Sequence, residues 1–113
     1  KSKKVKILKK LFINIKSYKI ITFCAGIYGE IILKNFINFG SKISCVVDNN
    51  VHYSGKKLCK IEIKNPLYLK KNFKKLSNHK LLICNKSKVA FNKIIKQLTK
   101  IGFKRKNIIH IAI

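Results

Sequence analysis

The segment from Lys19 to Gly29 reads K-I-I-T-F-C-A-G-I-Y-G, and it decides the fold. Its first half, Lys19 to Cys24, is short, apolar and β-branched, which is typical of a strand buried on both faces. Its second half, Cys24 to Gly29, is a glycine turn. The apolar residues that follow recur at helical spacing, at Ile31, Ile32, Leu33, Phe36 and Ile37. A strand, a glycine turn and a helix in this order predict a βα unit built to bind an anion.

Strands and helices alternate outward from this segment. We expect strands at 19–24, 42–48, 60–64, 80–85 and 107–113, with residues 51–58 as a loop. We expect helices at 5–16, after the glycine turn up to Gly40, from Pro66 to about Leu76, and from Ser87 to Gly102. Apolar strands that alternate with amphipathic helices indicate the α/β class. Right-handed crossovers then predict a three-layer, Rossmann-like domain, with a parallel sheet of about five strands in the order 3-2-1-4-5 and helices on both faces.

The length of 113 residues corresponds to a single domain. We divide it into an N-terminal amphipathic helix, residues 1–17, and a nucleotide-binding core, residues 18–113. The chain begins with lysine and contains no methionine, so we expect it to be a fragment of a larger protein. No apolar run approaches the roughly 18 residues of a membrane span, and no signal peptide is visible. We therefore expect no membrane span and a cytoplasmic location.

The formal net charge is +24, with lysine supplying 26 of the 27 basic residues. Proteins that grip phosphate or read bases rely on arginine, whose planar fork bonds in a bidentate way. We therefore interpret much of the lysine excess as coding bias on solvated faces, and not as a dedicated nucleic-acid surface. The only acids are Glu30, Asp48 and Glu62. The positive field is expected to attract anionic small molecules and to bind polyanions only non-specifically.

No catalytic or metal-binding constellation is visible in the sequence. The four cysteines lack the C-x-x-C spacing of a zinc site, and we interpret them as reduced, mostly buried thiols. The histidines have no acid or thiol at metal or triad spacing. There is no serine in a nucleophile elbow, and there are no paired carboxylates. We therefore predict neither catalytic residues nor metal ligands.

The candidate site is the turn Cys24-Ala25-Gly26-Ile27-Tyr28-Gly29. Gly26 lets the backbone approach a phosphate, and Gly29 allows the helix to pack closely on the strand. Cys24 stands where the usual G-x-G-x-x-G pattern begins. Asp48 ends the second strand, which is where a ribose-binding acid lies in this fold. The alternative for Asp48 is a purely local role at the start of the Asp48-Asn49-Asn50 turn.

Three further residues complete the candidate set. Tyr28 is expected at the mouth of the turn, where it stacks on a base, closes over a phosphate or packs beneath the loop. Asn49 adjoins Asp48, and Lys86 follows the fourth strand at the same sheet edge as a candidate anion contact. Glu30 is assigned to the helix surface, where its charge suits the helix dipole. The expected ligand is an anionic nucleotide-type small molecule, namely a nucleotide-sugar or NAD(P).

Taken together, several motifs resemble those of a known group of domains. These are C-A-G-I-Y-G at 24–29, D-N-N at 48–50, G-K at 55–56, I-E-I-K-N-P-L-Y-L at 61–69 and Q-L-T-K-I-G-F at 97–103. With them the chain resembles small Rossmann-like domains appended to bacterial surface-polysaccharide biosynthesis proteins, among them glycosyltransferases, sugar methyltransferases and epimerase or dehydratase relatives. The resemblance implies a nucleotide or nucleotide-sugar on Gly26, Gly29 and Asp48. Glycine is common in that group where this chain has Cys24. A side chain there narrows the space for a pyrophosphate, so that binding would be weaker, altered or lost.

Four functions remain open on the sequence. The first is an accessory nucleotide-binding domain of a carbohydrate-modifying transferase, and the second is a structural or assembly domain with a vestigial site. The third is an NAD-dependent epimerase or oxidoreductase, against which stands the absence of a substrate domain. The fourth is a lysine-rich nucleic-acid-binding protein. Contacts with other domains of the same polypeptide, or with a second copy in a homodimer, also stay open.

Overall fold

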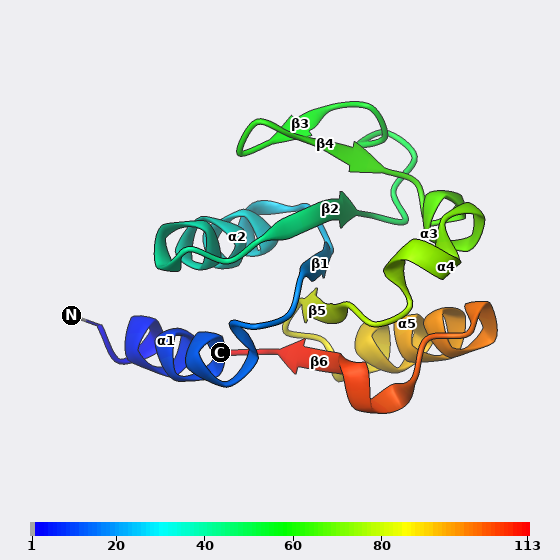
Figure 1. Ribbon diagram of the computed structural model, residues 1–113. Helices are drawn as coiled ribbons and strands as arrows, with labels where there is room; N and C mark the ends of the chain where they lie inside the picture. Colours follow the sequence, from blue (N-terminus) through cyan, green and yellow to red (C-terminus); the bar gives the residue numbers. More distant parts are fainter. Residues whose placement is uncertain (1) are drawn as a thin grey trace.

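The structure, a computed structural model, describes residues 2–113; Lys1, the first residue of the predicted segment 1–17, lies outside this range. One six-stranded sheet has the order β3-β4-β2-β1-β5-β6 (Figure 1). All neighbouring strands are parallel except β3, which is antiparallel to β4. The strands are β1 (Ile20–Phe23), β2 (Ile43–Val47), β3 (Lys57–Leu58), β4 (Ile61–Lys64), β5 (Lys80–Cys84) and β6 (Ile108–Ile111).

Helices cover both faces of this sheet, with α1 and α2 on one side and α3, α4 and α5 on the other (Figure 1). Their bounds are α1 (Lys3–Ile15), α2 (Ile27–Phe39), α3 (Leu67–Lys71), α4 (Phe73–Leu76) and α5 (Lys88–Ile101), and a short 3-10 helix covers Arg105–Asn107. Strand β1 is buried at every position, and its neighbouring residues Ile20 and Ile21 belong to the cores on opposite faces. This burial on both faces explains why the sequence of β1 is a near-continuous run of apolar residues.

The α/β class and the parallel sheet covered on both faces are confirmed. The predicted order 3-2-1-4-5 corresponds to β4-β2-β1-β5-β6, but the full order has one additional strand. Strand β3 lies inside 51–58, which was wrongly expected to be loop throughout. It pairs with β4 through a turn at Cys59 and Lys60, whose φ angles are 51° and 67°. Such turns normally carry asparagine or glycine, so the sequence offers no signal for this hairpin.

The helix predicted from Pro66 to about Leu76 is divided at Asn72 into α3 and α4. The side chain of Asn72 donates a hydrogen bond to the carbonyl of Tyr68, one turn earlier. The predicted ends of the longer helices are confirmed. Gly40 ends α2 with a φ of 101°, and Ser87 caps α5 by accepting a hydrogen bond from the amide of Ala90.

Across residues 2–113, no helix combines the length and the apolar character needed to cross a membrane.

Candidate functional site

The glycine turn lies at the carboxyl edge of the sheet, between the end of β1 and the start of α2. The chain continues from β1 to β2 on one side, while β5 pairs with β1 on the other side. Strand order therefore reverses between β1 and β5, and in open parallel sheets ligands bind at this kind of reversal. The sequence-predicted turn thus occupies the position that the fold offers to a ligand.

Cys24 has the backbone conformation that favours glycine, with a φ of 87°. Its amide donates to the carbonyl of Val47, 2.8 Å away, which ties the turn to the end of β2. Its side chain is directed toward the residue after β5, because the Asn85 amide nitrogen lies 3.6 Å from the Cys24 sulfur. Although a side chain replaces the usual glycine, a Cβ added to Gly26 would meet no protein atom within 4 Å. The space at Gly26 is therefore open.

The thiol of Cys24 is not an activated nucleophile. Burial raises the pKa of this thiol, the hydrogen bond from Asn85 lowers it in part, and the nearby Asp48 carboxylate raises it further. The balance is a pKa above the usual value, so the group stays protonated at neutral pH.

Gly29 allows α2 to pack against the turn. A Cβ at this residue would collide with the backbone carbonyl of Cys24, so any side chain would push the helix away from the strand. The close packing expected of Gly29 is confirmed. Gly26, by contrast, faces open space, so the two glycines of the turn serve different purposes.

The first backbone amides of α2, next to the open space at Gly26, have no protein acceptor among residues 2–113. Gly26 is the N-cap and its carbonyl accepts from Glu30, but no side chain caps the helix. Among the hydrogen bonds of residues 2–113, none is donated by the amides of Gly26, Ile27 or Tyr28. Unpaired amides and the positive end of the helix dipole make this position favourable for an anion.

Asp48 connects the end of β2 to the turn. One carboxylate oxygen accepts a hydrogen bond from the amide of Ala25 at 2.6 Å, and the other accepts from the amide of Asn50 at 2.7 Å. The acid therefore reaches the glycine turn and also makes the local turn that was the alternative interpretation. Each oxygen keeps acceptor capacity for a hydroxyl group. The ribose contact stays a prediction.

Asn49 is directed away from the turn. Its side-chain amide exchanges two hydrogen bonds with the amide of Gln97 on α5, at 3.0 and 2.8 Å.

Tyr28 and Lys86 lie together beside the first turn of α2. The Tyr28 hydroxyl accepts from the amide of Ile113 at 2.7 Å and lies 3.2 Å from the carbonyls of Ile111 and Ile113. The ammonium of Lys86 lies over the Tyr28 ring, 5.3 Å from its centroid. The Tyr28 hydroxyl therefore contacts the end of the chain after β6, a contact that neither predicted role included, and a contact of the Tyr28 ring with a ligand stays a prediction.

Sequence reasoning did not connect Asn85 with His110. Nε2 of His110 lies 2.9 Å from the carbonyl of Asn85 and 3.1 Å from its side-chain oxygen. The imidazole also stacks on Phe91, with ring centroids 4.0 Å apart. Because Asn85 also contacts Cys24, a polar chain runs from β6 to the glycine turn. Strand pairing creates this chain, and no local sequence signal predicts it.

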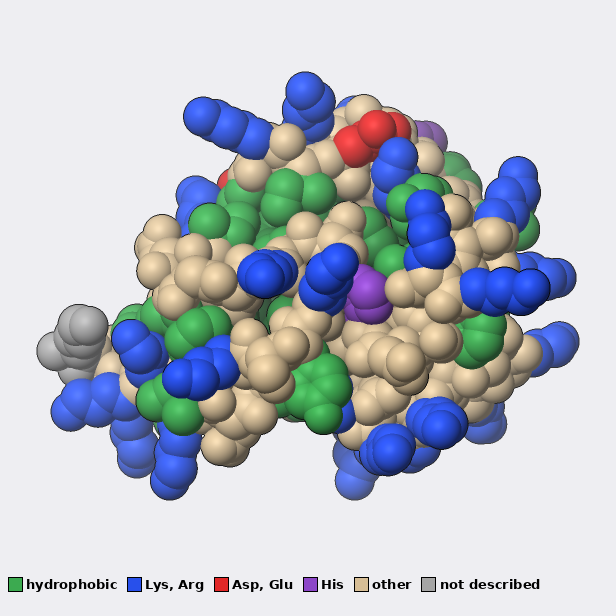
Figure 2. Space-filling model, viewed as in Figure 1, with side chains coloured by type: hydrophobic (Ala, Val, Ile, Leu, Met, Phe, Trp, Pro, Cys, Tyr) green, Lys and Arg blue, Asp and Glu red, His purple; other side chains and the backbone are tan. Residues whose placement is uncertain are grey.

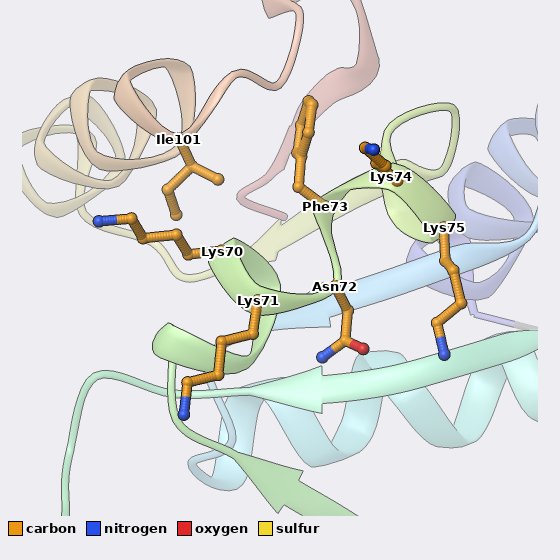
Figure 3. A pocket seen from close by; sticks show the side chains of 7 residues that line it. All are labelled: Lys70, Lys71, Asn72, Phe73, Lys74, Lys75 and Ile101. Carbon is orange, nitrogen blue, oxygen red and sulfur yellow. The ribbon is translucent and has the colours of Figure 1, made fainter.

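A hollow of about 450 Å³ lies elsewhere, beside α3, α4 and the end of α5. Figure 3 shows Lys71 and Lys75 extending on the opposite side of the α3–α4 segment from Phe73. These lysines do not converge on one point, and no candidate residue lines the hollow. A smaller groove of about 240 Å³ between α1 and α2 is lined in part by Tyr28 and Lys86.

Positive charge is spread over the surface and is not concentrated at the site. Figure 2 shows lysine and arginine side chains around the whole visible face, with few acids among them. The described residues contain two ion pairs, Lys34 with Glu30 and Lys64 with Glu62. Neither involves Asp48.

The fold and the turn define a Rossmann-like α/β protein, and comparisons with solved structures agree. The structure is similar to UDP-D-quinovosamine 4-dehydrogenase from Vibrio fischeri, with 23% identity, a TM-score of 0.65, and coverage of 83% of this chain and 77% of that chain. It is also similar to RSP, a Rex-family repressor, with 18% identity, a TM-score of 0.64, and coverage of 93% and 56%. RSP in complex with beta-NADH has 17% identity, a TM-score of 0.59, and coverage of 90% and 59%.

These similarities show the fold alone. The chain spans little more than half of the RSP chains. No family model matches the sequence. No curated protein matches it either.

Proposed function

We propose that this chain is a nucleotide-binding domain whose ligand lies on the first turn of α2. The observation that carries the proposal is the open space at Gly26, next to amides that have no protein acceptor. A phosphate placed there would accept hydrogen bonds from backbone N–H groups and would meet the positive end of the helix dipole. Asp48 lies one hydrogen bond away, at Ala25, where a ribose hydroxyl would be within reach.

The ligand class that we propose is a nucleotide-sugar or NAD(P). Two solved neighbours support this choice, since one is a UDP-sugar dehydrogenase and another is bound to beta-NADH. Lys86, held over the Tyr28 ring beside the turn, would add a positive charge near the phosphates. The net charge of +24 would favour the approach of any such anion.

We further propose that the domain binds its ligand as an accessory to a carbohydrate-modifying transferase in surface-polysaccharide biosynthesis. This context is supported by three motifs that resemble those of the small Rossmann-like domains appended to such proteins. They are the glycine turn, the D-N-N motif and the Q-L-T-K-I-G-F motif. A binding role also agrees with the chemistry of the site, where burial raises the pKa of the Cys24 thiol and leaves it protonated.

A structural domain with a vestigial site is the second candidate. It is favoured by the fact that the Asp48 carboxylate and the Tyr28 hydroxyl already have protein partners. The two candidates differ in one measurable property, which is selective binding at Gly26.

The test is a thermal-shift screen of the parent and of Gly26→Val with nucleotide-sugars, NAD(H), S-adenosylmethionine and coenzyme A at two salt concentrations. We expect one ligand class to raise the Tm of the parent even at the higher salt. Gly26→Val should lose this shift because its side chain fills the space for the phosphate, while no protein atom opposes it.

The control is Ser17→Val, which introduces the same valine side chain at an exposed residue. Ser17 lies shortly before β1, at the opposite edge of the sheet from Gly26. It should bind like the parent. If every polyanion shifts the Tm and higher salt removes all the shifts, the positive field alone is responsible and the nucleotide site is wrong. Equal binding by the parent and Gly26→Val would also refute it.

A further inference from the structure

The loop that follows β2 is held by hydrogen bonds between its own side chains and backbone. Asp48 accepts from the amide of Asn50 at 2.7 Å, and Asn50 in turn accepts from the amide of His52 at 3.0 Å. Asn49 is different, because its side chain leaves the loop and reaches another element.

Asn49 and Gln97 form a reciprocal pair that we call the amide clasp. The Asn49 amide nitrogen donates to the Gln97 oxygen at 3.0 Å, and the Gln97 nitrogen donates to the Asn49 oxygen at 2.8 Å. Two antiparallel hydrogen bonds fix the relative orientation of both side chains as well as their distance. The clasp joins two of the motifs singled out in the sequence, D-N-N and Q-L-T-K-I-G-F.

The position of the clasp relates it to the candidate ligand. Helix α5 follows β5, on one side of the strand reversal, and the loop after β2 lies on the other side. Asp48, adjacent to Asn49, is bonded to Ala25 in the glycine turn. The loop that carries the acid is therefore attached on one side to the turn and on the other to α5.

The clasp is poorly placed to contribute much to folding. Both hydrogen bonds are exposed to solvent, where they compete with water. The core on this face is instead built from fully buried residues of the strands and of α5, such as Phe23, Ile83 and Leu98. The geometry instead indicates that the clasp orients the loop that carries Asp48.

We propose that Gln97 is a positioning residue: through Asn49 it holds the loop after β2 so that Asp48 faces the glycine turn, and it thereby confers selectivity for nucleotides over inorganic phosphates. The inference rests on the proposed function. Without the clasp the loop would have to be ordered when ligand binds, which costs affinity. A ligand with ribose hydroxyls would bear this cost, whereas pyrophosphate on the amides of α2 would not.

The test compares Gln97→Ala, Asn49→Ala and the double variant with the control Asn92→Ala. Asn92 is an exposed amide on the same helix whose side chain makes no hydrogen bond within residues 2–113. Dissociation constants for UDP, NAD⁺ and inorganic pyrophosphate are measured by calorimetry, with Asp48→Ala as the reference for loss of the acid. We expect each single variant to bind the selected nucleotide about three- to tenfold more weakly. Pyrophosphate affinity should not change, and the double variant should bind no more weakly than either single one.

A second measurement needs no ligand. The backbone amides of Asn50 and His52 should exchange with deuterium faster in Gln97→Ala and in Asn49→Ala, but not in Asn92→Ala. If the exchange rates do not change, the positioning role is wrong, whether or not the parent binds a nucleotide. If the parent binds neither nucleotide, that failure by itself counts against the proposed function and not against the positioning role. With a binding-competent parent, equal weakening of pyrophosphate and nucleotide, or full nucleotide affinity in Gln97→Ala, would also overturn the inference.

Discussion

Thr22 in β1 and Cys24 in the turn after it each have a feature that lowers the stability of a folded protein. Thr22 is 1% exposed, and its hydroxyl has no hydrogen-bond partner among residues 2–113. Its neighbours across the sheet are Val46 and Leu82, which offer no polar side chain. Two residues later, Cys24 adopts the left-handed backbone region. Such costs often collect beside functional sites, which agrees with the candidate turn.

Replacing Thr22 by valine should stabilise the protein. Valine keeps the β-branched shape and removes the unpaired hydroxyl, so we expect the free energy of unfolding to rise by about 1 kcal/mol. Urea unfolding monitored by circular dichroism measures this difference. Thr99→Val is the control, because the Thr99 hydroxyl is exposed and bonds to the carbonyl of Ile95. A less stable Thr22→Val would mean that the hydroxyl has a partner the fold does not reveal.

At the scale of elements, one contact connects strands that are not neighbours. The hydroxyl oxygen of Ser44 on β2 lies 2.7 Å from Nε2 of His79, the residue that directly precedes β5. Strand β1 separates β2 from β5 in the sheet, so the contact passes over the beginning of β1. Burial lowers the pKa of His79, and the nearby Lys19 ammonium lowers it further. The neutral imidazole is therefore the form that the folded protein favours.

Stability should consequently fall as the pH falls below the ordinary histidine pKa of about 6.5. In that range the unfolded chain protonates His79 while the folded protein resists, so the unfolded state binds more protons and gains in stability. We expect urea midpoints to decline between about pH 7 and pH 5 in the parent, and to decline less in His79→Gln. An identical decline in both proteins would show that His79 does not carry the effect.

The elements that sequence reasoning missed share a physical cause. Asn72 interrupts the helix predicted after Pro66, although the apolar spacing continues through it to Leu76. The β3–β4 hairpin turns at Cys59 and Lys60, neither of which is a residue that normally favours positive φ. In both places, we infer, packing against the sheet stabilises a local conformation that the residues themselves do not prefer.

At the scale of the whole molecule, charge opposes folding. The chain has a net charge of +24 and only three acids, and the two ion pairs among the described residues are solvent-exposed surface pairs. The cationic side chains surround the visible face in Figure 2, so their mutual repulsion is not confined to one patch. Repulsion of this kind destabilises the compact state and is reduced by salt.

Raising sodium chloride from about 0.01 M to about 0.15 M, which shortens the Debye length from about 30 Å to about 8 Å, should therefore raise the Tm. Differential scanning calorimetry checks this, with sucrose at matched osmolarity as the uncharged control. A Tm that does not respond to salt would indicate that the lysines are too far apart or too mobile to repel one another appreciably.

The layers and the order of the five parallel strands follow from local sequence patterns. Strands covered on both faces require near-continuous apolar runs, and right-handed crossovers between them leave one simple order. The sequence also indicates where α2 ends and where α5 begins, because Gly40 and Ser87 act locally at these caps. The identity of the polar groups that meet at the carboxyl edge depends instead on how the elements pack. Asp48 bonds to Ala25, Asn49 to Gln97 and His110 to Asn85, across sequence separations of 23, 48 and 25 residues. These pairings depend on strand register and side-chain rotamers, which are set by packing between elements and not by any local pattern.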